Sequence, residues 1–207
     1  MSGLIGKKIG MTSIFASNGD VIPVTIVQAG PCVVTGILTN EKNGYEALQL
    51  GYGFVKEKHL NKPLKGYFEK NEIEPKKILK EFRGFDVNGF KIGDVIDCSI
   101  FNEGELIKVR AKSKGKGFQG VVKRHGFGGI GMTTHGQSDR VRAPGSIGGS
   151  SFPSRVFKGQ RMAGRMGFVN VTIRNLKIVR IEKEKNLIFI KGAIPGANNT
   201  IVELVKN

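Results

Sequence analysis

A glycine-rich stretch in the second half of the chain is the first candidate for chemistry. Residues 115–120 read Gly-Lys-Gly-Phe-Gln-Gly, the GxGxxG spacing that lets a backbone approach the pyrophosphate of a dinucleotide. Asp139 follows about twenty residues later, where such a site places a carboxylate against the ribose. A dinucleotide site also needs a helix directly after the motif, but only residues 121–125 precede the next glycine, Gly126. Because that segment is too short for a βαβ crossover, we predict that the motif binds no cofactor.

Nucleophilic catalysis has equally weak support in the sequence. The stretch Gly145-Ser146-Ile147-Gly148 lacks the first glycine of a nucleophile elbow, since Pro144 stands in its place. His135 and Asp139 complete the residue types of a hydrolase triad, but no rigid scaffold around them would align the three side chains. We therefore expect no catalytic residue, no small-molecule substrate and no enzymatic activity.

The histidines and cysteines do not form a metal site. His59, His125 and His135 show neither HxxxH nor HExxH spacing. Cys32 and Cys98 lie 66 positions apart, each inside an apolar stretch, and this spacing fits no zinc or redox motif. The sequence predicts two buried, reduced cysteines and no bound metal.

Basic residues are concentrated in one part of the chain. The whole protein has 33 Lys and Arg against 17 Asp and Glu, which gives a net charge of +16. Residues 111–168 contain fourteen glycines, eleven Lys and Arg and one acidic residue, so this segment alone carries +10. The other 149 residues carry +6. An excess that is localised in this way indicates a polyanionic partner, usually nucleic acid and less often an anionic membrane.

The basic segment is composed like an RNA-binding segment. Residues 112–116 form a short basic run, and residues 155–165 (RVFKGQRMAGR) interleave four cations with Phe157 and Met162. Arginine binds phosphate through two hydrogen bonds and also stacks on bases. The apolar residues follow no sustained helix or strand period, so little burial offsets the entropy of ordering so many glycines, and folded RNA is the expected support. These apolar residues are Phe127, Ile130, Met132, Ile147, Phe152, Phe157, Met162 and Met166.

The remaining sequence predicts a β-barrel. Short apolar runs with β-branched residues, separated by turn signals such as Asn43-Gly44, fill residues 1–110 and return in residues 170–207. Residues 56–82 are rich in Lys and Glu and predict a short helix. A closed barrel is favoured because closure leaves no exposed strand edges. We expect a barrel domain (residues 1–110 with 170–207, the helical insertion at about 56–82) and a basic extension over residues 111–169.

No membrane segment is expected. Lys7 and Lys8 interrupt the apolar N-terminus before a signal-peptide core can build, and no stretch approaches about 18 uninterrupted apolar residues. The cytoplasm is the expected location.

Five blocks distributed along the chain resemble the bacterial form of ribosomal protein three of the large subunit, and they occur in the same order. The blocks are Gly3–Met11 (GLIGKKIGM), Ser113–Arg124 (SKGKGFQGVVKR), Pro144–Gly148 (PGSIG), Val156–Gly167 (VFKGQRMAGRMG) and Lys191–Ala197 (KGAIPGA). The resemblance implies a six-stranded translation-factor-type barrel on the surface of the large ribosomal subunit. It also implies a long looped extension that reaches through the large-subunit ribosomal RNA toward the peptidyl-transferase centre.

The same resemblance implies a role and partners. Members of this family bind ribosomal RNA early in assembly, touch neighbouring ribosomal proteins and act inside the cytoplasmic ribosome. The chain departs from many bacterial relatives at Gly149, where those relatives carry a glutamine that is methylated, so this modification is not expected here.

The residues expected to contact ribosomal RNA are the cations and two histidines of the extension, together with two lysines near the N-terminus. They are Lys7, Lys8, Lys112, Lys114, Lys116, Lys123, Arg124, His125, His135, Arg140, Arg142, Arg155, Lys158, Arg161 and Arg165. Two other functions remain as alternatives: an NAD-dependent oxidoreductase that uses the GxGxxG motif, and a chromatin-type DNA-binding protein that uses the same charge.

Overall fold

The protein consists of two compact units in a computed structural model that describes residues 2–131, 135–136 and 139–207. The barrel unit comprises the chain up to Ser113 together with Asn170–Asn207, and the extension unit comprises Lys114–Val169.

The barrel unit contains ten strands, two short α-helices and three 3-10 helices among its described residues. The strands are β1 (Gly3–Phe15), β2 (Val21–Ala29), β3 (Cys32–Leu38), β4 (Ala47–Phe54), β5 (Lys76–Phe82), β6 (Val95–Ile96), β7 (Leu106–Lys112), β10 (Asn170–Glu182), β11 (Leu187–Lys191) and β12 (Ile201–Lys206). The helices are α1 (Asn40–Asn43), α2 (Lys62–Lys70), η1 (Glu57–His59), η2 (Val87–Gly89) and η3 (Cys98–Ile100).

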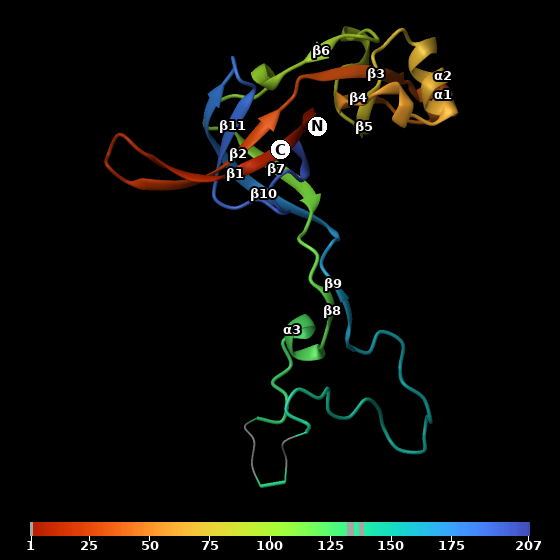
Figure 1. The fold of residues 1–207 in the computed structure, drawn as a ribbon, viewed down its shortest axis with the longest axis vertical. Coiled ribbons are helices and arrows are strands. Elements are labelled where there is room, and N and C mark those ends of the chain that lie inside the picture. The colour runs from red at the N-terminus through yellow and green to blue at the C-terminus, as the bar shows by residue number, and fades with distance from the viewer. Residues whose placement is uncertain (1, 132–134, 137–138) are drawn as a thin grey trace. The chain divides into compact units, whose positions relative to one another are not determined.

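Six of these strands close into a fully antiparallel barrel in the order β1-β12-β7-β10-β11-β2 (Figure 1). The mainly β class and the closed six-stranded barrel expected from the sequence are thereby confirmed. Closure joins strands from the two ends of the chain, because β1 pairs with β12 from Gly3 opposite Val205 onward. The barrel therefore needs both segments that flank the extension.

The barrel interior is filled by alternate side chains of each strand, as the two-residue period of a strand requires. On β7, Ile107, Val109 and Ala111 are buried and alternate with the more exposed Leu106, Lys108, Arg110 and Lys112. Val109 faces Leu204 of β12 across the ladder, and both side chains have no exposed surface. Burial of such aliphatic side chains contributes about 1.5–3 kcal/mol each relative to exposure, so this core carries the stability of the unit.

The insertion between β2 and β7 is larger than the sequence analysis expects. Strands β3 to β6 do not join the barrel but form a separate antiparallel sheet in the order β5-β4-β3-β6. Residues 32–96 therefore form an inserted sheet with its own helix, and the assignment of all of residues 1–110 outside 56–82 to the barrel is corrected. Apolar alternation fixes which face of a strand is buried, but it does not reveal which strand lies next to it.

The helix predicted in residues 56–82 is present as α2, and its Phe68 is buried. The hydroxyl oxygen of Tyr67 lies 2.6 Å from Thr35 O and 2.7 Å from Gln49 Oε1, and its single proton is donated to one of these acceptors or shared between them, which fixes the helix to the inserted sheet. The end of the same segment is not helical, because Lys76–Phe82 is strand β5. Lys77 and Lys80 of this edge strand are exposed, a common protection against further strand pairing, whereas Lys76 is half-buried.

The barrel and the inserted sheet share one hydrophobic core, and Gly3 marks where they meet. A Cβ atom at Gly3 would lie 2.8 Å from the ring of Phe82, and it would also collide with the carbonyl oxygen of Leu204. Because such contacts are shorter than carbon atoms tolerate, only glycine lets β5 approach β1 this closely.

Both cysteines are buried in this core, as predicted. Burial raises the pKa of the Cys32 thiol to about 12, so the thiolate needed for redox or metal chemistry is disfavoured. Within the described part of the chain, no helix is long and apolar enough to cross a membrane.

Candidate nucleic-acid interface

The extension unit begins and ends with a short two-stranded ladder. Strand β8 (Gly117–Gln119) pairs antiparallel with β9 (Gly164–Met166), with Phe118 opposite Arg165. The amide of Lys116 donates to Met166 O at 2.9 Å and extends the pairing by one residue. The ladder joins the chain just after the basic run 112–116 to the end of the basic run 155–165, and Arg165 is the one cation that lies in a strand of this ladder.

A five-residue helix, α3 (Val121–His125), follows β8 directly. It ends at Gly126, which adopts φ 73°, a left-handed conformation that glycine adopts without steric cost. The GxGxxG motif is therefore followed by one short helix and an antiparallel partner strand, not by a βαβ unit. A dinucleotide-binding crossover would need a longer helix after the motif and then a parallel strand.

The extension unit has almost no apolar core. Among its described residues, Val121 is the only buried apolar side chain. Large apolar side chains remain exposed instead, including Phe118 at 77% and Phe152 at 91%. Of the apolar residues singled out in the sequence, Met132 lies outside the described residues. A segment that buries so little surface cannot offset its own ordering entropy.

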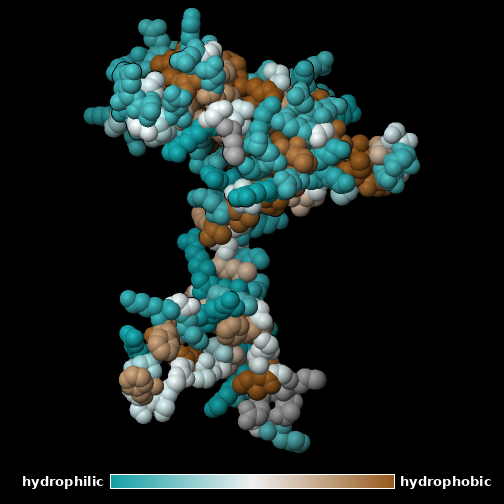
Figure 2. Space-filling view, turned by 180° about the vertical axis from the view of Figure 1, so that it is seen from behind, coloured by the Kyte–Doolittle hydropathy of each residue, from teal (hydrophilic) through white to brown (hydrophobic). Residues whose placement is uncertain are grey.

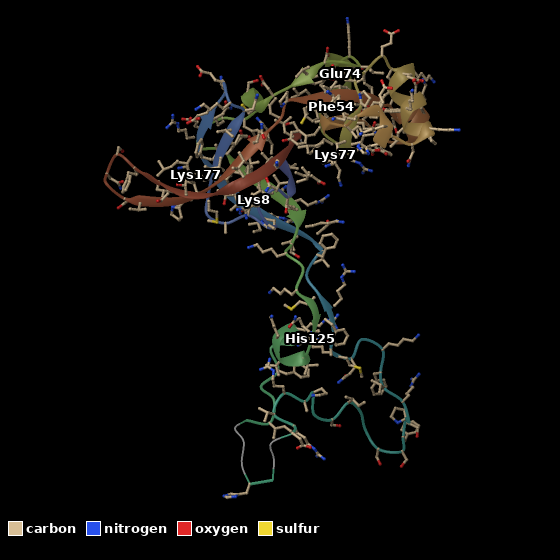
Figure 3. All side chains as sticks on the ribbon, viewed as in Figure 1. Lys8, Phe54, Glu74, Lys77, His125 and Lys177 are labelled. Carbon is tan, nitrogen blue, oxygen red and sulfur yellow. The ribbon has the colours of Figure 1, made fainter. Side chains whose placement is uncertain are left out.

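Two predicted RNA-contacting residues have a structural role in the unit. Arg124 donates from Nη1 to Met162 O at 2.6 Å, and Nε2 of His125 lies 3.0 Å from the same oxygen. Gly164 leaves room for the Arg124 guanidinium, because a Cβ at that position would lie 2.6 Å from Nη1. Both side chains are half-buried and fasten the returning chain to α3, where His125 is labelled in Figure 3.

The other cations of the unit are exposed. None of its Lys or Arg side chains forms an ion pair within the described residues; every ion pair found there lies in the barrel unit. The guanidinium of Arg155 lies 5.8 Å from the ring centre of Phe157, and that of Arg165 lies 5.6 Å from Phe168. Exposed arginines stacked on exposed rings present positive charge and flat apolar surface together, which suits phosphates and unstacked bases. The exposed members of the predicted set are Lys114, Lys116, Lys123, His135, Arg140, Arg142, Arg155, Lys158, Arg161 and Arg165.

The three predicted cations of the barrel unit differ from one another. Lys112 is exposed at the end of β7, and Lys7 is half-buried on β1. Lys8, labelled in Figure 3, is 6% exposed, and its ammonium donates to Ile194 O at 3.0 Å and Gly196 O at 3.1 Å. A buried ammonium satisfied by carbonyl groups cannot reach a phosphate, so Lys8 is removed from the candidate interface.

Comparison with known proteins agrees with this geometry. A family model described as "Ribosomal protein L3" matches residues 84–187, which is half of the chain. The chain is 54% identical to large ribosomal subunit protein uL3 of Chloroherpeton thalassium over 99% of both sequences. It is 53% identical to the protein of the same name from Chlorobium phaeobacteroides, covering 99% of this chain and 98% of the relative. The corresponding protein of Brachyspira hyodysenteriae is 55% identical, covering 99% of this chain and 93% of the relative.

The chain belongs to the ribosomal protein L3 family. It is therefore a structural ribosomal protein and not an enzyme. The resemblance drawn from the five sequence blocks is confirmed.

The three residues considered for a hydrolase triad are not arranged for catalysis, which agrees with the assignment to the L3 family. Ser146 donates its hydroxyl to Gly148 O at 2.9 Å, a local turn contact. His135 and Asp139 are both exposed. A nucleophile hydrogen-bonded to a base is the minimum for this chemistry, and Ser146 uses its hydroxyl proton elsewhere.

The L3 barrel also carries cations that sequence reasoning missed. Arg83, Lys108, Arg110 and Arg174 line a surface groove of about 600 Å³ at β7, β10 and the end of β5. Glu203 lies in the same groove, 3.1 Å from Lys80 and 3.7 Å from Arg110. Lys108 and Arg110 occupy outward positions of β7, and Arg174 lies on β10. The two-residue period of side chains along a strand could therefore have predicted part of this groove from the sequence.

Proposed function

We propose that this L3-family protein is a structural constituent of the large ribosomal subunit that binds large-subunit ribosomal RNA through its extension unit. The observation that carries the proposal is the combination of ten Lys and Arg, one Asp and one buried apolar side chain within the described part of residues 114–169. A folded domain would bury its apolar residues, and a solvated linker would lack the exposed Phe side chains. RNA provides both phosphates for the cations and bases for the aromatic rings.

The energetics favour binding to a folded polyanion. Each cation that neutralises a phosphate releases condensed counterions, which makes association favourable without a preformed apolar core. Glycines without a Cβ let a backbone approach RNA closely. Gly129 is required for an internal reason, because it has φ 73° and a Cβ there would collide with Val141 O of the same unit. The extension unit therefore obtains from RNA the packing that its own sequence does not provide.

The proposed contacts fall into two groups. The exposed residues bind phosphate or stack on bases, and Arg124 and His125 contribute mainly by holding the unit together. The exposed group consists of Lys112, Lys114, Lys116, Lys123, His135, Arg140, Arg142, Arg155, Lys158, Arg161 and Arg165, and the half-buried Lys7 of β1 is a further proposed contact.

The finer role follows from the family resemblance. We propose that the protein binds early in assembly and that its extension braces RNA near the peptidyl-transferase centre, supplying no catalytic group. Neighbouring ribosomal proteins complete its surroundings in the cytoplasmic ribosome. Bracing is a mechanical role that matches a unit whose order depends on RNA.

Two variants test this function. One replaces residues 126–168 by a short Gly-Ser turn, and the other keeps the full length but changes Arg140, Arg142, Arg155 and Arg161 to Gln, so that it removes charge without shortening the chain. Both should bind an rRNA fragment more weakly than the natural chain and should yield fewer complete large subunits. Normal assembly and normal translation rates with the shortened chain would show that the extension is dispensable.

Competition with duplex DNA separates RNA recognition from simple charge attraction. Structured rRNA fragments should displace the protein from DNA at equal nucleotide concentration. Equal competition by both nucleic acids would favour the chromatin-type alternative.

A further inference from the structure

The hairpin formed by β1 and β2 extends beyond the barrel as a two-stranded arm (Figure 1, red). Strand β12 pairs with β1 only as far as Lys7, and β11 pairs with β2 only from Val24 onward. Beyond these points, Gly10–Thr12 of β1 pair with residues of β2 that also pair with β11, whereas Ser13–Phe15 pair with Val21–Pro23 and with no further strand among the described residues. We call residues 9–22 the arm. The β1 edge of the arm is open along its whole length, and the β2 edge is open at Val21 and Ile22.

One face of the arm is apolar and exposed. Met11 and Phe15 lie two pleats apart on the same face of β1, and Val21 lies directly opposite Phe15 on β2. These side chains are 53%, 74% and 59% exposed, respectively. Figure 2 shows apolar side chains gathered on the arm, at the right of that view, just short of its hydrophilic turn.

The charge pattern argues against RNA as the occupant of this face. Residues 9–40 contain no Lys, Arg or His, although the chain has 33 Lys and Arg among 207 residues. The one charged residue in this stretch is Asp20, whose carboxylate accepts a hydrogen bond from Asn18 Nδ2 at 2.6 Å. Half or more of the hydrogen bonds in protein–nucleic acid interfaces go to phosphate and sugar, and the arm has no cation to make them.

An open, uncharged edge also needs a cover. Natural edge strands are protected by Lys, by Pro or by bulges. The hairpin has a bulge between Lys8 and Gly10 and a proline at Pro23, both near the base of the arm, but the outer part with Phe15 and Val21 contains neither lysine nor proline. Large aromatic side chains on such a surface are the usual anchors of a protein interface.

We infer that the arm docks onto the apolar surface of one neighbouring ribosomal protein, with Phe15 and Val21 as its anchors. The inference rests on the proposed incorporation into the large subunit. It adds a division of labour: the extension unit contacts RNA, and the arm contacts protein.

Photo-crosslinking in assembled large subunits tests the inference. The full-length chain carries benzoylphenylalanine in place of Phe15, and a control carries it in place of Phe54, which is similarly exposed at 65% on β4. Irradiation should link position 15 to one ribosomal protein in a product that survives ribonuclease and is destroyed by protease. Position 54 should not give this product. A ribonuclease-sensitive link to RNA, a link between two copies of this chain, or no link at all would overturn the inference.

A second variant measures the strength of the contact. The double substitution Phe15→Ser and Val21→Ser should let the crosslinked neighbour wash off subunits at severalfold lower salt, while Phe54→Ser should not. The free double variant should keep the melting temperature of the natural chain because both side chains are exposed. An unchanged wash-off salt overturns the docking role, whereas absence of the natural chain itself from large subunits would overturn the proposed function as well.

Discussion

The two units of this protein differ in how many of their own side chains they bury and pair. Of the 27 buried apolar side chains among the described residues, 26 lie in the barrel unit and one, Val121, lies in the extension unit. All seven ion pairs of the described residues also lie in the barrel unit. The barrel unit has its own core and its own ion pairs. Among the described residues, the extension unit has one buried apolar side chain and no ion pair. We therefore expect the buried side chains of the barrel unit to determine the stability of the protein, and the cations of the extension unit to determine its binding to RNA.

The largest expected effect concerns salt. If about 6–10 cations of the extension unit neutralise phosphates, affinity for an rRNA fragment should fall about a thousandfold or more between about 50 and 200 mM salt. Filter binding over this range measures the slope. A flat dependence would mean that the unpaired cations are a solvated surface, and the contrast between the two units would lose its functional meaning.

The next largest effect is on the free energy of unfolding, and it compares a buried side chain of the barrel unit with an exposed side chain of the extension unit. Leu204 has no exposed surface and faces Leu4 and Val109 on the adjacent barrel strands. Leu204→Ala should lower the free energy of unfolding by about 2–5 kcal/mol through lost burial and the cavity left behind.

Phe152→Ala in the extension unit is the matched control. It removes a larger side chain, but one that is 91% exposed, so the free energy of unfolding should change by less than about 0.5 kcal/mol. Chemical denaturation measures both variants. Equal destabilisation would show that the extension unit contributes to the core.

A smaller effect should appear in RNA affinity at single cations. Arg161→Ala or Arg165→Ala should each cost about 1–3 kcal/mol of binding if the guanidinium is desolvated against phosphate. Lys58→Ala, an exposed cation of the barrel unit, should change affinity little. Titration of a labelled rRNA fragment distinguishes these variants, and an equal loss at Lys58 would point to a diffuse charge effect.

The smallest expected effect is on the melting temperature of the shortened chain. Replacing residues 126–168 by a Gly-Ser turn removes none of the side chains buried in the barrel unit. The melting temperature should therefore stay within about 2 °C of the natural value, which calorimetry can resolve. Unfolding of the shortened chain would show that the division into units is wrong.

The sequence predicted the barrel because its signals are local. Apolar alternation and turn residues are read within ten residues, and closure follows from the need to remove strand edges. The inserted sheet was missed because apolar alternation shows that a segment such as β4 is a strand but not which strand lies beside it, and Leu48 of β4 pairs with Phe82 of β5 and not with a barrel strand. Its edge strand β5 also has a lysine-rich composition that a short helix shares.

The environment of Lys8 could be predicted from the sequence only in part. The two-residue period of a strand places Lys8 on the same face as the buried Leu4, which was a usable signal for an inward side chain. The carbonyl groups of Ile194 and Gly196, which accept hydrogen bonds from the Lys8 ammonium, lie more than 180 residues away in the sequence. No local sequence pattern indicates these contacts. Neighbouring lysines in the sequence thus have different roles.

The pairing of Lys112 with Asn170 has a consequence for how chains of this fold can vary. The two residues face each other across the β7–β10 ladder, so the intervening chain leaves and re-enters the barrel at a single rung. Once its ends are fixed together, doubling the length of a flexible loop costs only about 0.6 kcal/mol of closure entropy. Insertions and deletions between residues 112 and 170 therefore leave the ladder intact, and the depth to which such a protein reaches can change without redesign of its barrel.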